Sequence, residues 1–501
     1  MKLKVYTYRL SQPSRAVLIF CKLNGIDFEE ITVDLIKRQH LSPEFKEINP
    51  MRQVPTIVDG DFKLFESHAI LRYLACAFPG VADHWYPTDL TKRAKIDSVL
   101  DWHHSNLRRG ADTFLLNTVF APVLRIQPNP HVAAEAEKIL SASLEKIETF
   151  WIKENEQFLL GNTQPSMADL SLVCEIMQLE VLDEEDRNRI LGPHKKVQQW
   201  IEDTKLATRP HFEEIHKLLF EVKAKLQEQR LLGANTETDS KKKKNYTVEQ
   251  SPSTVQSNFG RERSHCLTFH RERERKKMKL KVYTYRLSQP SRAVLIFCKL
   301  NGIDFEEITV DLIKRQHLSP EFKEINPMRQ VPTIVDGDFK LFERYPTDLI
   351  KRAKIDSVLD WHHSNLRRGA VTFLQNTVFA PVLRIQPNPH VAAEAEKILS
   401  ASLEKIETFW LKENEQFLLG NTQPSMADLS LVCEIMQLEV LDEEDRNRIL
   451  GPHKKVQQWI EDTKLATRPH FEEIHRLLFE VKAKLQEQRL LGANTETESG
   501  L

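Results

Sequence analysis

Two hydroxyl side chains stand at predicted helix starts, where an anion is readily held. Ser11 precedes Gln12 and Pro13, and the apolar run that follows predicts a helix beginning at Ser11 or Gln12. Ser67 opens a second stretch with helical spacing, directly after Glu66. The free N–H groups and the dipole of a helix N-terminus stabilise negative charge. Both segments are therefore candidates for binding an anionic ligand, although Ser11 is also a good simple helix cap.

Other reactive side chains give weaker signals. His103 and His104 are adjacent and point about 100° apart on a helix, so they do not form the i, i+4 pair of a metal site. The six cysteines show no CxxC or Cys/His metal spacing, and Cys21, Cys76 and Cys174 lie on apolar helical stretches. The sequence contains no Gly-rich phosphate loop and no GxSxG elbow. We therefore expect no metal site and no serine-nucleophile chemistry.

These residues must be positioned by an α/β unit followed by a helical one. The predicted order up to residue 78 is strand, helix, strand, helix, strand, strand, helix, at residues 2–7, 11–24, 28–33, 42–48, 56–58, 62–65 and 67–78. After Tyr86 the strand signals stop and helical patterns run to about residue 232. Ser166 and Asp169 resemble a capping box, and the last amphipathic helix, from His211, is expected to end before Gly233.

The sequence contains two copies of one long unit. Residues 1–66 recur without change as residues 278–343, and residues 86–240 recur from Tyr345 onward with six substitutions. Copy 2 is 18 residues shorter, because Arg344 alone replaces residues 67–85. A repeat this long indicates duplication of a whole unit, because the repeats of solenoid proteins are only about 20 to 50 residues long. The substituted pairs are Thr91/Ile350, Asp112/Val371, Leu116/Gln375, Ile152/Leu411, Lys217/Arg476 and Asp239/Glu498.

A basic segment joins the two copies. Residues 241–277 hold 11 Lys and Arg against 4 Glu, whereas the 501-residue chain holds 71 basic and 72 acidic residues, a formal charge of −1. The rest of the chain is therefore acidic, which argues against a general nucleic-acid footprint. The segment lacks helical or strand periodicity, so we predict a disordered linker. Lys241–Lys244 fits either a nuclear localisation signal or an ordinary solvated linker.

A set of short motifs resembles those of the cytosolic glutathione S-transferases. SQPSRA follows the first predicted strand, QVP precedes the third, FES follows the fourth and SMADLSL opens a helix. Together with DHWYPTDL and WHHSNLRRG they are similar to the theta class in its plant form. The resemblance implies an α/β plus all-α fold, with a thioredoxin-like N-terminal domain and an all-helical C-terminal domain. Both are present twice, the second time with a deletion. The expected segments are residues 1–82 (thioredoxin-like), 88–236 (helical), 237–277 (linker), 278–344 (truncated thioredoxin-like) and 345–495 (helical).

The resemblance assigns the chemistry to Ser11 and Arg108. Ser11 would donate a hydrogen bond to the sulfur of the co-substrate glutathione, and Arg108 would add positive charge near it, unless it is merely a surface arginine. A cysteine thiol has a pKa of about 8.5, and lowering it by two units needs about 2.7 kcal/mol. A charge-assisted hydrogen bond supplies about 1.5 to 3 kcal/mol, and a helix N-terminus about 0.3 to 2 kcal/mol. The implied glutathione contacts are Ser11, Gln12, His40, Leu41, Gln53, Val54, Glu66 and Ser67.

The individual contacts follow from the same resemblance. Val54 precedes the family's cis-proline and would pair with the cysteinyl backbone of glutathione, beside Gln53 where theta members often carry lysine. Ser67 and the helix start would hold the γ-glutamyl carboxylate, and Glu66 its ammonium. His40 matches a position near the glycyl end, although a loop histidine is otherwise an ordinary surface residue.

Copy 2 has lost part of this set. The deletion leaves no counterpart of Ser67 and removes Ile70, Leu71, Leu74 and Phe78. Each buried apolar side chain contributes about 1.5 to 3 kcal/mol, against about 5 to 15 kcal/mol for a whole domain. We therefore predict that the second α/β domain is destabilised and its glutathione site inactive. The counterparts that remain are Ser288, Gln289, His317, Gln330, Val331, Glu343 and Arg367.

The sequence therefore predicts a tandem theta-like glutathione transferase. It would conjugate the thiolate to small hydrophobic electrophiles or reduce organic hydroperoxides, as a homodimer or an intrachain pseudo-dimer. The alternatives are a non-catalytic ligand-binding or scaffold protein, and a nuclear-targeted form acting through the linker. With no secretory leader and no apolar run near the 18 residues, roughly, of a membrane span, we expect a cytoplasmic protein that binds neither membrane nor nucleic acid.

Overall fold

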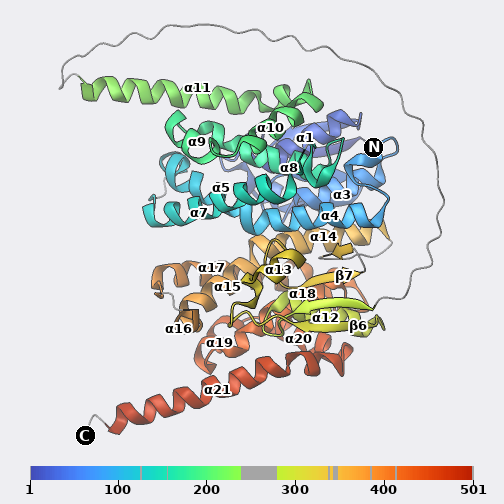
Figure 1. Ribbon diagram of the computed structural model, residues 1–501, viewed down its shortest axis with the longest axis vertical. Helices are drawn as coiled ribbons and strands as arrows, with labels where there is room; N and C mark the ends of the chain where they lie inside the picture. The colour runs from blue at the N-terminus through green and yellow to red at the C-terminus, as the bar shows by residue number, and fades with distance from the viewer. Residues whose placement is uncertain are drawn as a thin grey trace.

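The computed structural model describes residues 2–124, 127–154, 156–238, 279–336, 339–341, 348–383, 386–411 and 415–498. Figure 1 shows the two copies as two stacked halves, copy 1 in blue to green and copy 2 in yellow to red. The predicted linker, Glu343 and Arg344 lie outside the described residues.

The first half begins with a four-stranded sheet of order β2-β1-β3-β4. Strand β1 pairs in parallel with β2 and antiparallel with β3, and β3 pairs antiparallel with β4. Leu3 and Val5 are buried while Lys2 and Lys4 are exposed, as the alternation in the sequence predicts. The elements are β1 (Leu3–Thr7), α1 (Gln12–Leu23), β2 (Phe28–Thr32), η1 (Gln39–Leu41), α2 (Pro43–Ile48), β3 (Thr56–Asp59), β4 (Phe62–Phe65) and α3 (Ser67–Ala77).

Helices α1 and α3 pack on each other and supply most of the apolar core of this domain. Ile70, Leu71 and Leu74 of α3 are fully buried, whereas Phe78, expected in the core, lies past the end of α3 and is half-buried. Phe20 of α1 is also buried, with its ring 5.6 Å from that of Trp85. The helical pattern of residues 67–78 therefore identifies the helix that covers α1.

The remainder of copy 1 is helical, which confirms the predicted fold class. At the start of α8 the predicted capping box is present, with Asp169 accepting from the backbone N–H and the hydroxyl of Ser166. The elements are η2 (Asp83–Trp85), α4 (Leu90–His103), η3 (His104–Arg108), α5 (Arg109–Leu115), η4 (Leu116–Phe120), α6 (Ala121–Leu124), α7 (Pro130–Lys146), η5 (Ile147–Trp151), η6 (Leu159–Gly161), α8 (Met167–Ile176), η7 (Met177–Val181), α9 (Glu184–Leu191), α10 (Lys195–Ala207) and α11 (His211–Thr238).

One predicted helix end is wrong. Helix α11 does not end before Gly233 but runs to Thr238. A glycine inside a helix costs only about 1 kcal/mol relative to alanine, so Gly233 does not stop the helix unless the chain turns there. None of the helices in the described residues has both the length and the apolar character that a membrane span requires.

The second half repeats this arrangement without a counterpart of α3. Its described sheet has the order β6-β5-β7-β8, and α14 is the next described helix after β8. The elements are β5 (Leu280–Thr284), α12 (Gln289–Leu300), β6 (Phe305–Thr309), η8 (Gln316–Leu318), α13 (Pro320–Ile325), β7 (Thr333–Asp336), β8 (Phe339–Leu341), α14 (Leu349–Ser364), α15 (Leu366–Thr377), α16 (Ala380–Leu383), α17 (Pro389–Lys405), η9 (Ile406–Trp410), η10 (Leu418–Gly420), α18 (Met426–Ile435), η11 (Met436–Val440), α19 (Glu443–Leu450), α20 (Lys454–Ala466) and α21 (His470–Glu498).

The loss of α3 leaves part of the copy 2 core uncovered. Phe297 is only half-buried, whereas its copy 1 counterpart Phe20 is fully buried. Val294 is likewise half-buried, and Leu300 is 39% exposed. Hydrophobic stabilisation scales with the apolar area removed from water, so these exposures agree in direction with the predicted destabilisation, which itself stays a prediction.

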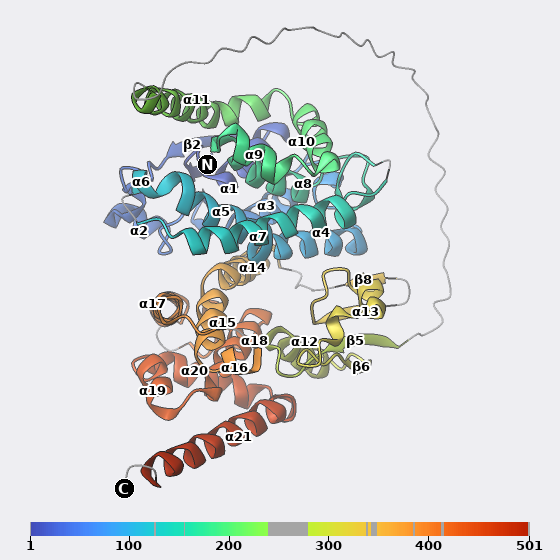
Figure 2. The same cartoon turned by 60° about the vertical axis from the view of Figure 1, so that its left-hand side comes forward.

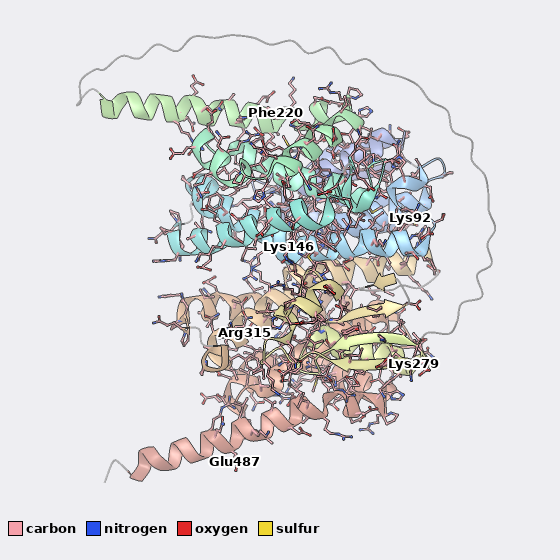
Figure 3. The ribbon with its side chains drawn as sticks, in the orientation of Figure 1. Lys92, Lys146, Phe220, Lys279, Arg315 and Glu487 are labelled. Carbon is pink, nitrogen blue, oxygen red and sulfur yellow. The ribbon has the colours of Figure 1, made fainter. Side chains whose placement is uncertain are left out.

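The two copies pack against each other with near twofold symmetry. Lys146 of α7 donates to the carbonyl of Pro327 (3.0 Å), and its counterpart Lys405 of α17 donates to that of Pro50 (2.9 Å). Figure 3 shows Lys146 at the boundary between the halves. From a second direction α14 again lies against copy 1 (Figure 2), and it packs on α3, η3 and β4. Each copy's sheet domain therefore contacts the other copy's helical domain.

Candidate active site

Ser11 lies at the N-cap of α1 with extended backbone angles, φ −78° and ψ 122°. Its backbone N–H donates to the carbonyl of Tyr8 (2.8 Å), but its side chain makes no capping hydrogen bond. A serine at this position ordinarily accepts a hydrogen bond from the helix backbone. The hydroxyl of Ser11 is thus half-buried and available to a ligand at a helix N-terminus, which weakens the interpretation of Ser11 as a simple cap.

A buried arginine fixes the turn that carries Ser11. Arg15 is fully buried, and its Nη1 donates to the carbonyls of Arg9 (3.2 Å) and Leu10 (3.0 Å). Its Nη2 donates to the carbonyl of Cys174 (2.9 Å) and to the side-chain oxygen of Gln178 (2.8 Å). These bonds tie the residues before Ser11 to α8 and η7 of the helical domain, so both domains position the hydroxyl.

Arg108 is not a free surface residue. Its Nη1 lies 3.1 Å from Oε2 of Glu175, which is 1% exposed, and its Nη2 lies 3.3 Å from Oδ2 of Asp112. Asp112 also accepts from Nε2 of Gln12 (2.8 Å), the neighbour of Ser11. Burial acts to lower the pKa of Arg108, but the carboxylates Asp112, Glu175 and Glu66 together raise it above its ordinary value. A permanently charged guanidinium thus stands beside the start of α1.

Glu66 is the N-cap of α3, and Ser67 is the first residue of this helix. Glu66 adopts φ 70° and ψ 120°, a conformation that is strained for any residue except glycine. Burial and the nearby carboxylate of Asp360, from copy 2, raise the pKa of Glu66 to about 8, against the opposing effect of Arg108. Backbone strain of this kind clusters at ligand-binding sites, and the first N–H groups of α3 lack helical acceptors.

The other predicted contacts come from two loops. Val54–Pro55 is a cis peptide bond, and the carbonyl of Gln53 accepts from Nδ2 of Asn49 (2.8 Å). His40 is half-buried with its Nδ1 lacking a hydrogen-bond partner among the described residues, and its neighbour Leu41 is 42% exposed. Burial, then Arg38 and Arg52, lower the pKa of His40. This cationic loop suits a carboxylate.

The corresponding site of copy 2 is wide. A cavity of about 1070 Å³ is lined by Ser288, Gln289, His317, Gln330, Val331 and Arg367, together with Asp101 and Trp102 of copy 1. Val371 and Gln375, two of the six substitutions between the copies, also line it. Arg367 keeps its pairing with Glu434 (3.1 Å), but Val371 supplies no carboxylate to Gln289. Glu343 lies outside the described residues.

Sequence reasoning missed several residues that shape the site. Asp112 carried a signal, since it is one of the few positions where the copies differ. Arg15 lies within SQPSRA, but its bonds to residues 174 and 178 depend on the tertiary fold. Asp360 gave no signal, because it is separated from Glu66 by nearly 300 residues and comes from the other copy.

Comparison with known proteins identifies a family and several relatives. The sequence profile of the family "Glutathione S-transferase, N-terminal domain" matches residues 1–76 and again 278–344. Glutathione S-transferase T1 of Arabidopsis thaliana is 66% identical over 233 residues, which cover 46% of this chain and 95% of that protein. Human glutathione S-transferase theta-1 is 44% identical over 178 residues, or 35% of this chain and 73% of that protein.

A solved human structure is similar to one copy. It is described as a theta-class glutathione transferase in complex with the glutathione conjugate of 1-menaphthyl sulfate, and is 34% identical. The similarity covers 46% of this chain and 92% of that one, with a TM-score of 0.42. The 66% identity to the Arabidopsis protein over 95% of its length, the similarity to human theta-1 and the repeated family match show that the chain belongs to the theta class of the glutathione S-transferases, in its plant form.

Proposed function

We propose that copy 1 carries the transferase activity of this chain and that Ser11 activates the glutathione sulfur. The observation that carries the proposal is the hydroxyl of Ser11, which occupies a helix N-cap without capping the helix. It can donate to a thiolate, while the α1 N-terminus and Arg108 stabilise the negative charge. Each pKa unit by which the thiol is lowered corresponds to about 1.36 kcal/mol of preferential stabilisation of the thiolate.

Glutathione would lie across the loops and helix starts of copy 1. The start of α3 at Ser67 suits the γ-glutamyl carboxylate, and Glu66 with Asp360 suits its ammonium. The backbone of Val54, beside Gln53, would pair with the cysteinyl residue. His40 and Leu41, close to Arg38 and Arg52, would receive the glycyl carboxylate. Both carboxylates, the ammonium and the cysteinyl backbone of the tripeptide thus have proposed partners.

Two reactions follow from one thiolate. In conjugation, the sulfur lone pair forms a bond to an electrophilic carbon and the leaving group departs with its electron pair. In peroxide reduction, the sulfur attacks one peroxide oxygen, the O–O bond breaks and an alcohol leaves after protonation. The oxidised sulfur is then reduced by a second glutathione, giving the disulfide and water. The small hydrophobic electrophile or hydroperoxide would bind beside the helical domain.

Copy 2 is proposed to lack this activity. It retains Ser288 and Arg367, but residues 67–85 have no counterpart, so the γ-glutamyl end would lose its helix start. Weak binding, and not the loss of the serine, would therefore inactivate the second site.

A matched pair of variants tests this assignment in the full chain. Ser11→Ala should abolish most of the conjugation of small halides and the reduction of cumene hydroperoxide, while Ser288→Ala should leave both unchanged. Retention of Ser11→Ala on glutathione resin would show that the site still binds. If Ser11→Ala kept at least half of the activity, the assignment to copy 1 would be wrong. Retention of the unaltered chain on glutathione resin without any turnover would favour a non-catalytic ligand-binding or scaffold role.

We also propose that the two copies act as an intrachain pseudo-dimer in the cytoplasm. The paired contacts of Lys146 and Lys405 support this arrangement, and light scattering should then give the 58.3 kDa of one chain. A mass twice as large would favour a homodimer of whole chains. Nuclear entry through Lys241–Lys244 remains the second location to test, by comparing the full chain with one lacking residues 241–277.

A further inference from the structure

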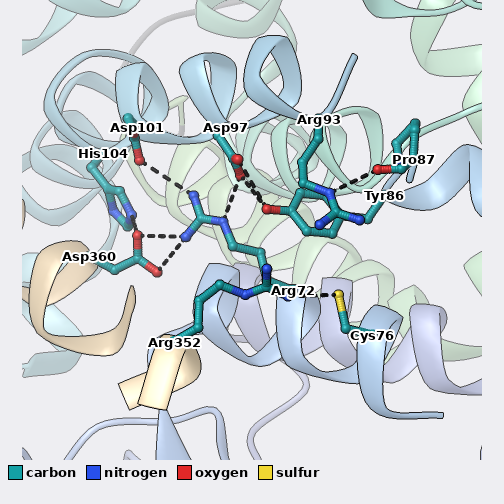
Figure 4. Close-up of polar contacts among 10 residues, drawn as sticks. All are labelled: Arg72, Cys76, Tyr86, Pro87, Arg93, Asp97, Asp101, His104, Arg352 and Asp360. Carbon is teal, nitrogen blue, oxygen red and sulfur yellow. Dashed lines mark hydrogen bonds and ion pairs between the residues drawn. The ribbon is translucent and has the colours of Figure 1, made fainter. Parts of the chain in front are cut away.

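Two histidines and an aspartate from different copies meet at the boundary between the halves. They are His68 of α3, His104 at the start of η3, and Asp360 of α14. Their ligand atoms all lie within 4.8 Å of one another, and the residues are 1%, 7% and 1% exposed. Figure 4 shows His104 and Asp360 facing each other beside Arg72. The triad is separate from Ser11 and from the loops around His40, but Asp360 also lies near Glu66 at the proposed γ-glutamyl end of the glutathione site.

The two imidazole rings of this cluster each keep a ring nitrogen without a hydrogen-bond partner in the described part of the chain. Nδ1 of His68 and Nδ1 of His104 are buried without a hydrogen-bond partner among the described residues. Nε2 of His104 lies 3.5 Å from Oδ1 of Asp360, too far for a good hydrogen bond. Leaving a buried polar atom without a partner costs about 1 to 3 kcal/mol, so such atoms indicate a water or an ion.

Neighbouring groups prepare both ends of the triad for a cation. Nε2 of His103 lies 3.3 Å from the buried carboxylate of Glu175, and Nδ1 of His103 lies 3.2 Å from Nε2 of His68. With the proton of His103 on the side of Glu175, His68 donates through Nε2 and keeps a lone pair on Nδ1. Arg72 holds Asp360, with Nη1 3.3 Å from both oxygens. Such outer contacts orient metal ligands.

The charge balance also favours a cation. Arg72 faces Asp97 (2.8 Å), Asp101 (3.5 Å) and Asp360 (3.3 Å), so one guanidinium serves three carboxylates. The copy 2 counterpart of Arg72 falls within the deletion.

We propose that His68, His104 and Asp360 bind one divalent transition-metal ion of the zinc type, which links copy 1 to copy 2. Two imidazole nitrogens and one carboxylate oxygen suit zinc or its neighbours, whereas magnesium and calcium prefer oxygen ligands alone. Water would complete the coordination. His363 and Asp101 are the counterparts of His104 and Asp360, but the deletion removes any counterpart of His68. The stoichiometry is therefore one ion per chain.

Cobalt titration of the full chain tests the site independently of its activity. After removal of metals with a chelator, Co²⁺ should produce visible d–d absorption that saturates at one ion per chain and disappears when Zn²⁺ is added. His104→Asn and Asp360→Asn should each weaken Co²⁺ binding by at least about tenfold. The matched control is His363→Asn, at the equivalent copy 2 position, which should bind Co²⁺ as tightly as the unaltered chain.

A thermal melting curve is recorded for each variant without metal. If one of the variants fails to fold, His68→Gln is tested in its place. A spectrum of weak, unsaturated binding in the unaltered chain would overturn the proposal. Equal binding by His104→Asn and the unaltered chain would also overturn it, as would a loss in His363→Asn as large as that in His104→Asn.

Discussion

Replacing Arg72 by methionine should destabilise the contact between the two copies. Arg72 is 2% exposed and pairs with Asp97 in its own copy and with Asp360 in the other. Removing one partner of a buried ion pair costs about 3 to 5 kcal/mol, because the other partner remains buried without compensation. At about 2 to 4 °C per kcal/mol for domains of this size, the melting temperature should fall by roughly 6 to 20 °C.

The loss should depend on pH in a defined direction. Burial acts to raise the pKa of Asp360, but Arg72 and His104 lower it below its ordinary value. A carboxylate with a lowered pKa contributes stability above its unfolded pKa of about 3.9, and this contribution is lost as the pH falls through the folded pKa. Without Arg72 burial dominates, so the pKa rises and protonation stabilises the variant as the pH falls. The difference between variant and unaltered chain should be largest near pH 8 and smaller at pH 5.

Thermal melts of metal-free protein at several pH values between 5 and 8 measure this effect. Arg109→Met serves as the control, because Arg109 is an exposed arginine at the start of α5 and its loss should change the free energy of unfolding by less than about 0.5 kcal/mol. A loss below about 1 kcal/mol for Arg72→Met would show that the ion pairs contribute little. An equal loss at pH 5 and pH 8 would refute the electrostatic explanation.

Three further predictions concern the site and its support. Restoring residues 67–85 in place of Arg344 should raise bound glutathione from one to two per chain in calorimetry, and adding Ser288→Ala should then remove the gained activity alone. Burial raises the pKa of Glu66 to about 8, so this carboxylate ionises as the pH rises through 8. The KM for glutathione should therefore fall between pH 7 and 9. A fall of the same size in the Glu66→Gln variant would contradict this prediction. Asp169→Ala should lower the free energy of unfolding, measured with denaturant, by about 3 to 5 kcal/mol. The substitution leaves three buried donors, Leu159 N, Ser166 N and Trp200 Nε1, without their acceptor. A loss under about 1 kcal/mol would show that water replaces the carboxylate as acceptor.

Much of the fold is local in origin and could be predicted from the sequence. The period-two alternation of Leu3 and Val5 and the helix start beside Ser11 each depend on neighbouring residues alone. The capping box of Ser166 and Asp169 is equally local, and the structure contains it. The predicted end of α11 was wrong because Gly233 weakens the helix without ending it. No local signal distinguishes a glycine inside a helix from one that ends it.

The sequence by itself determined the duplication, the family and the position of Ser11 at a helix start, because each is written in the order of residues. Only the tertiary structure decided the electrostatics. Arg108 faces Glu175, and Glu66 has its pKa raised by burial and by Asp360, because chain segments far apart in the sequence converge out of water. Coulomb interactions strengthen as solvent is excluded, so the charge of each group depends on neighbours that no sequence window contains. The same convergence brings His68, His104 and Asp360 together across two copies of one ancestral unit.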